Sequence, residues 1–276
     1  IEGALDYLWR HNFFVDRTGD EKGCYHFQQQ LREGLRRQAA VVLSAQEWEE
    51  VRLLAAEWHR RHGQPLVALK YLLSAELYTE AELLLSQQGT MLITGERLTE
   101  LTELMKALPE RVSVKRGWMA LFTGICMYQY QSKDAYNWLE LARTLFVSTG
   151  EERGELLTLI QQVLQYLIVD GRLVLGRELL PRLEELLERH TEELDLRSCS
   201  KGYVALAIGK TFFGSNLEQA ESFAREGMKC AMKADSAESQ FDLRLVCAYL
   251  ALLKGRYSLM FAELESGYDL IRHFSP

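Results

Sequence analysis

A repeat of paired amphipathic helices constrains the fold of this chain more than any other feature. Helix pairs are expected at 116–130 with 133–149, 152–170 with 172–190, 199–213 with 217–233, and 238–254 with 256–273. Spacings of 38, 44 and 40 residues separate the starts of the second helices, near Ala135, Leu173, Leu217 and Tyr257. A period near 40 residues built from two helices indicates a tetratricopeptide-like solenoid. The sequence therefore predicts an all-α fold, a tetratricopeptide-like, right-handed solenoid of helical hairpins.

The first 43 residues predict a different unit. A short helical segment leads into the apolar run Phe13, Phe14 and Val15, and the turn-rich sequence RTGDEKG separates this run from a second one at 25–27. Two short apolar runs across a Gly/Asp turn predict a β-hairpin, such as the wing of a winged-helix unit. We expect 1–43 to be the end of a winged-helix region, 44–115 a helical arm, and 116–276 the solenoid.

Helix start and stop signals support the assignment of the arm. Ser44 with Glu47 three residues later forms a capping box, which marks a helix start. Gly63 is placed where a helix ends, and Pro65 falls in the first turn of the next helix. Only 4 of the 276 residues are proline, which favours long uninterrupted helices.

Composition and charge exclude several classes of protein. The net charge of −7 makes the chain a poor binder of polyanions, so no direct contact with DNA is expected. The apolar stretch at 156–169 contains three glutamines, so it is not expected to serve as a membrane helix, and no signal peptide is expected. Five cysteines without a CxxC pair indicate reduced thiols in a cytoplasmic protein without a metal site. Because the chain begins at Ile1 rather than Met, we expect it to be a piece of a longer protein.

No pattern predicts catalysis. Gly171 and Gly176 have the spacing of a phosphate-binding loop, but Arg177 stands where that loop needs lysine. His59 and His62 share a helix face but lack the HExxH pattern of a zinc protease. We therefore expect no enzymatic activity and no cofactor in this stretch.

Polar side chains inside apolar helices are the candidate binding residues. The glutamines Gln161 and Gln165 share a helix face, and Lys210 and Arg244 interrupt two later apolar helices. With the aromatic ring of Tyr128, these residues predict a groove for a small polar effector or a peptide. The alternative is that the aromatic residues only pack between helices and the polar residues face water.

Three segments, in order, resemble the MalT-like family of LuxR-type transcriptional regulators, which belong to the ATP-dependent STAND class. NFFVD followed by YHFQQQLREGL is similar to the end of the family's winged helix, with matches at Tyr25, Phe27, Leu31, Arg32, Glu33 and Leu35. Gln28 and Gln29 replace the usual His-Pro pair. The segment 55–85 resembles the family's arm through Trp58, Gly63, Ala68, Ala75 and Ala81. The segment 107–124 resembles the opening of its sensor solenoid, with Gly117 where proline is common.

The resemblance implies a regulatory, signal-sensing segment. In this family ATP binds an N-terminal module, and DNA binds a C-terminal domain; both would lie outside this chain. The expected partner is a small-molecule inducer or a regulatory protein, self-association is a further expectation, and no membrane contact is expected. A tetratricopeptide scaffold that docks protein partners, with neither module attached, is the alternative.

Overall fold

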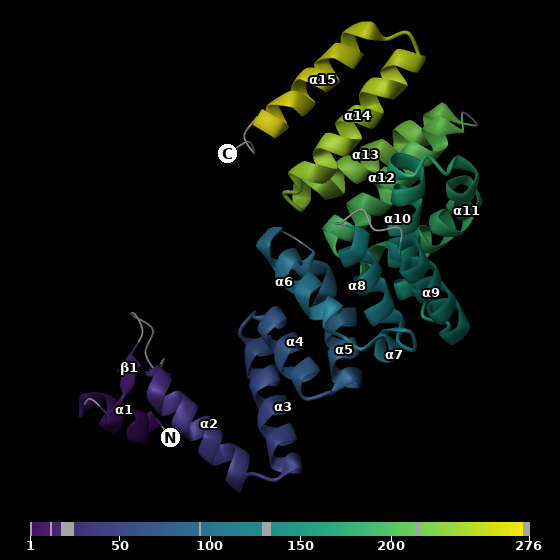
Figure 1. Ribbon diagram of the computed structural model, residues 1–276. Coiled ribbons are helices and arrows are strands. Elements are labelled where there is room, and N and C mark those ends of the chain that lie inside the picture. The colour runs from purple at the N-terminus through teal and green to yellow at the C-terminus, as the bar shows by residue number, and fades with distance from the viewer. Residues whose placement is uncertain are drawn as a thin grey trace. The chain divides into compact units, whose positions relative to one another are not determined.

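The computed structural model describes residues 2–11, 13–17, 25–93, 95–128, 134–213 and 216–272. Fifteen α-helices and one two-stranded sheet make up the described residues, so the prediction of an all-α fold is confirmed (Figure 1). The chain divides into two compact units, Ile1–Ala75 and Glu76–Pro276. The boundary between them lies inside the range 44–115 expected for the helical arm, and the three-part division remains a prediction.

The first unit contains the predicted hairpin. Its elements are α1 (Glu2–Arg10), β1 (Val15–Arg17), β2 (Tyr25–Phe27), α2 (Gln29–Val42), α3 (Ala45–Arg61) and α4 (Pro65–Ser74). The two strands pair antiparallel with Val15 opposite Phe27, so the β-hairpin is confirmed, while most of its predicted turn lies outside the described residues.

The predicted helix signals of this unit are confirmed. Ser44 caps α3, and its hydroxyl and backbone N–H both engage Glu47 in a capping box. Gly63 takes the left-handed conformation at φ +69° that ends the helix, and Pro65 opens α4.

The second unit begins with short helices and continues as four helical pairs. The short elements are α5 (Tyr78–Gln88), a 3₁₀ turn η1 (Gly89–Leu92), α6 (Gly95–Lys106) and α7 (Glu110–Ser113). The first pairs are α8 (Gly117–Tyr128) with α9 (Asp134–Thr149) and α10 (Glu152–Leu164) with α11 (Leu173–His190). The later pairs are α12 (Leu196–Phe212) with α13 (Leu217–Lys233) and α14 (Ala237–Leu253) with α15 (Tyr257–Arg272). A π-turn η2 (Gln165–Val169) ends α10, and a 3₁₀ turn η3 (Thr191–Glu193) follows α11.

The first helices of the four pairs form a continuous layer. Helices α8, α10, α12 and α14 contact one another in succession, whereas α9, α11 and α13 each pack mainly against the first helices on both sides (Figure 1). We call these four helices, with η2, the first-helix layer. Because successive first helices contact one another, the pairs bury one continuous core. Its fully buried side chains include Phe122, Leu156, Ile160 and Leu206.

Close helix approach in this unit depends on glycine. The ring of Phe146 on α9 fills the space beside Gly117 of α8 and Gly154 of α10, and a Cβ on either glycine would lie within 2.6 Å of that ring. None of the helices that the structure describes has the length and hydropathy needed to cross a membrane.

Candidate ligand-binding hollows on the first-helix layer

Two hollows open on the first-helix layer. The Gln161 hollow lies between η1, α8, α10 and α12 and is lined by Thr90, Ile93, Leu121, Phe122, Ile125, Leu157, Ile160, Gln161, Arg197, Ser198 and Lys201. The Asp242 hollow lies between η2, α12 and α14 and is lined by Leu167, Ile168, Ile208, Thr211, Phe212, Asp242, Leu245, Val246 and Tyr249.

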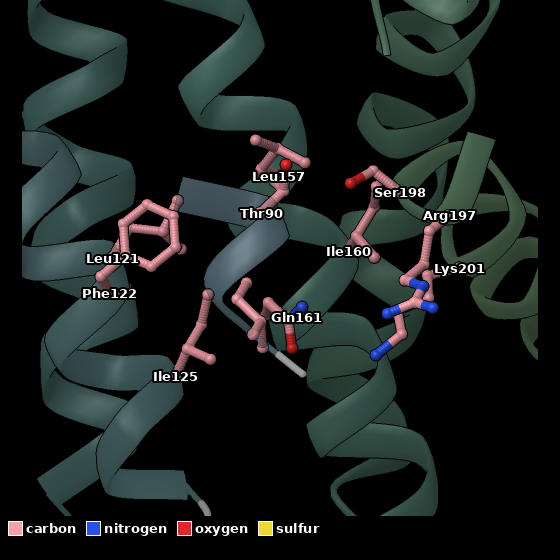
Figure 2. A pocket seen from close by; sticks show the side chains of 11 residues that line it. Thr90, Leu121, Phe122, Ile125, Leu157, Ile160, Gln161, Arg197, Ser198 and Lys201 are labelled. Atoms are coloured by element: carbon pink, nitrogen blue, oxygen red, sulfur yellow. The ribbon is translucent and has the colours of Figure 1, made fainter. Parts of the chain in front are cut away.

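The Gln161 hollow has an apolar wall and a polar wall. Figure 2 shows Leu121, Phe122 and Ile125 on one side, Arg197 and Lys201 on the opposite side, and Gln161 between them. Its volume is about 30 Å³, which has room for water but not for an organic molecule. The guanidinium and ammonium groups give its edge a local positive charge.

The Asp242 hollow is the larger of the two. Its volume is about 380 Å³, within the range of sites that hold small molecules. Its walls include Ile168, Phe212 and Tyr249, which are about half exposed, and the Phe212 and Tyr249 rings meet edge to face at 6.4 Å. Exposed apolar side chains gathered around a concave surface are typical of binding sites.

Helical phase explains how Asp242 enters this hollow. Residues 242, 245, 246 and 249 recur at intervals of three and four, so Asp242, Leu245, Val246 and Tyr249 share one face of α14. The π-turn after α10 brings Leu167 and Ile168 to the opposite wall. Such turns are frequent at functional sites.

Burial sets the protonation of the groups around Asp242. The pKa of the Asp242 carboxyl is raised to about 6, mainly by burial; the charge of Glu238 adds to the rise, and Lys201 opposes it. Burial also raises the pKa of Tyr128, and the nearby carboxylates of Asp170, Asp242 and Glu238 add to that shift. Tyr128 therefore lies within the electrostatic reach of the Asp242 hollow.

The structure separates the five residues singled out in the sequence. Gln161 lines the smaller hollow, and Tyr128 lies near Asp242. Gln165 opens the π-turn and is 6% exposed, and its Oε1 has no hydrogen-bond partner among the described residues. A buried amide oxygen without a partner is costly, and the neighbouring Gln162 has the same property at both of its amide atoms.

The other two predicted residues lie between first and second helices. The Lys210 ammonium contacts Glu184 Oε2 on α11 at 2.6 Å, and Arg244 Nη1 contacts Glu263 Oε2 on α15 at 2.6 Å. Neither residue lines either hollow. Both form ion pairs between helices, and the structure does not bring them to Gln161.

Sequence reasoning did not find Lys201 or Asp242. At 3.6 residues per turn, Lys201 and Lys210 lie about 180° apart around α12, and Asp242 and Arg244 lie about 200° apart around α14. The spacing of the apolar residues along each helix indicates which of its faces points inward. The inward face of each helix, and not the polarity of its residues alone, therefore distinguishes Lys201 and Asp242.

Comparisons with known proteins give no relative. No family model, curated protein or solved structure matches the chain. Among the described residues, no group of three or more His, Cys, Asp or Glu side chains could hold a metal ion.

One stability prediction follows from the burial of Asp242. Because its pKa rises from 3.8 to about 6 on folding, the folded state binds this proton more tightly than the unfolded state. The free energy of unfolding therefore falls as pH rises from about 4 to about 6. Asp242→Asn is expected to stabilise the chain by about 1–2 kcal/mol near pH 7.5, a value that allows for the partial exposure of Asp242. Near pH 4 the substitution is expected to have little effect.

Urea unfolding of both proteins at the two pH values measures this difference. Glu238→Gln is the matched control, because Glu238 lies one turn away but is largely exposed and paired with Lys201. Equal stability of the parent and Asp242→Asn near pH 7.5 would contradict the assigned burial.

Proposed function

We propose that this chain is the signal-sensing segment of an ATP-dependent transcriptional regulator of the MalT-like, LuxR type. In this proposal its helical pairs are tetratricopeptide-like repeats of a right-handed solenoid, residues 1–43 end a winged helix, and the chain catalyses nothing. The nucleotide-binding and DNA-binding modules lie outside the chain. The three sequence segments that resemble this family, in the family's order, support the assignment.

The Asp242 hollow is the observation that carries the sensing role. It is formed by η2, α12 and α14, so a ligand bound there contacts three successive pairs at once. Such a ligand favours whichever arrangement of the pairs fits it best, and that preference can bias a distant module. By linkage, a signal and ATP that favour the same active state must each strengthen binding of the other.

The coding sequence around this chain tests the family assignment. A phosphate-binding loop with Gly-Lys-Ser/Thr before the chain and a helix-turn-helix after it are expected. The absence of both modules would overturn the assignment to a transcriptional regulator. The purified chain is also expected to show no ATP turnover, and turnover that persists after further purification would contradict its non-catalytic role.

A protein-docking scaffold is the second candidate, and one observation favours it. The last helix, α15, exposes the aromatic rings of Tyr257, Phe261 and Tyr268. Exposed aromatic side chains are enriched in protein interfaces. The scaffold function is supported if the coding sequence encodes neither a nucleotide-binding nor a DNA-binding module. It also requires that Phe261→Lys abolish binding to a protein partner that the parent chain binds.

A further inference from the structure

The Asp242 carboxyl is an unpaired acid in an apolar setting. Among the described residues, none forms a hydrogen bond or an ion pair with it. The other lining residues are apolar except for the hydroxyl groups of Thr211 and Tyr249, and the Thr211 hydroxyl already donates to the Ala207 carbonyl at 2.6 Å. Burial of an acid without a partner is unfavourable, and a ligand that supplies a donor would relieve that cost.

The charges around the hollow favour a cation. Glu238 lies one turn before Asp242 on α14, and Asp170 lies close enough to affect the pKa of Tyr128. The ammonium of Lys201 is within reach of Asp242 but contacts Glu238 at 3.3 Å. A bound anion would meet like charge here, and a purely apolar ligand would leave Asp242 unpaired.

We propose that the Asp242 hollow binds a small organic amine, with the ammonium group on the Asp242 carboxylate and an alkyl or aryl body between Ile168, Phe212 and Tyr249. This inference rests on the proposed sensing function and names the ligand class. The charge-assisted hydrogen bond fixes the head of the ligand. The apolar walls supply the area that the body buries.

Binding of such an amine is expected to depend on pH. The groups that face Asp242 are Glu238 on its own helix, Lys201 on α12, and Tyr128 on α8, with Asp170 near Tyr128. An alkylammonium stays charged below about pH 9, whereas the pKa of Asp242 is about 6. The dissociation constant is therefore expected to be about tenfold larger near pH 5 than near pH 7.5.

Calorimetric titration of the 276-residue chain with three compounds of similar size tests the proposal. Phenethylamine is expected to bind, while phenethyl alcohol and phenylacetate, which lack the ammonium, bind at least about tenfold more weakly. Asp242→Asn is expected to weaken phenethylamine binding by about tenfold or more. Glu265→Gln, which changes an exposed carboxylate of α15 that does not line the hollow, is the control and should change binding by less than about threefold.

The outcomes separate this inference from the proposed function. Equal binding of amine and carboxylate, or undiminished binding by Asp242→Asn, would overturn the amine site. Because Asp242→Asn is expected to be more stable than the parent, loss of binding cannot be ascribed to unfolding. If amines fail but a compound of another class binds at the Asp242 hollow, the inference falls and the sensing function stands; if no compound binds, both fall.

Discussion

Replacing Phe146 by alanine is expected to lower the free energy of unfolding of the Glu76–Pro276 unit by about 3–5 kcal/mol. The ring is buried, and it meets Trp118 edge to face at 5.1 Å. It also fills the space beside Gly117 and Gly154, so its removal leaves a cavity shared by α8, α9 and α10. Because Gly117 and Gly154 have no side chains, α8 and α10 cannot fill that cavity without moving their backbones.

The converse change tests the same packing from the other side. Gly154→Ala would place a Cβ 2.4 Å from Cε1 of Phe146, and is expected to cost about 1–3 kcal/mol. Gly267→Ala in the same unit is the matched control, because its added Cβ would lie no closer than 3.6 Å to a neighbouring side chain and alanine favours the helix. Chemical unfolding followed by circular dichroism measures all three variants. A change below about 1 kcal/mol for Phe146→Ala would contradict the packing of these helices.

Arg182→Met is expected to destabilise the same unit by about 2–3 kcal/mol. This cost is smaller than that of breaking a fully buried ion pair, because Arg182 is partly exposed. Arg182 on α11 holds Glu155 on α10 with two hydrogen bonds, Nε to Oε1 at 2.9 Å and Nη2 to Oε2 at 2.8 Å. Glu155 is only 5% exposed, so loss of the guanidinium leaves a buried carboxylate without its partner. The cost is mainly the desolvation of that charge.

A double-mutant cycle measures this pair. Glu155→Leu in the Arg182→Met background is expected to recover most of the loss, because two apolar groups can replace a buried ion pair. Glu185→Gln is the control: Glu185 also binds Arg182, but it is half exposed and is expected to contribute less than about 1 kcal/mol. Equal costs for Arg182→Met and Glu185→Gln would contradict the special position of Glu155.

Much of the fold could be predicted because local signals and tertiary packing agree. The four helical pairs follow the apolar periodicity, and the caps at Ser44 and Gly63 have local chemical causes. The π-turn at Gln165–Val169 could not be predicted in this way. It has no local sequence signature, and Leu167 within it packs against Gly176 of α11, a contact that only the folded chain defines.

The candidate site was less accessible from the sequence. Polar residues within apolar helices point to candidate positions, but the face of the helix decides whether such a residue meets a hollow or a neighbouring helix. Lys210 and Arg244 lie on faces that meet second helices, where Glu184 and Glu263 pair with them. Asp242 is two residues before Arg244 and faces the hollow. The partner carboxylates lie 26 and 19 residues away along the chain, so no local pattern reveals them.

The most direct test of the first-helix layer as a ligand-binding surface is a thermal-unfolding screen against sugars, amino acids, nucleotides, aromatic acids and amines. A ligand at a hundredfold excess over its Kd stabilises the native state by about 2.7 kcal/mol, which raises Tm by several degrees. We expect at least one class to produce this shift, and Asp242→Asn to abolish it. A panel without any shift, or a shift that survives Asp242→Asn, would contradict the assignment of ligand binding to the Asp242 hollow.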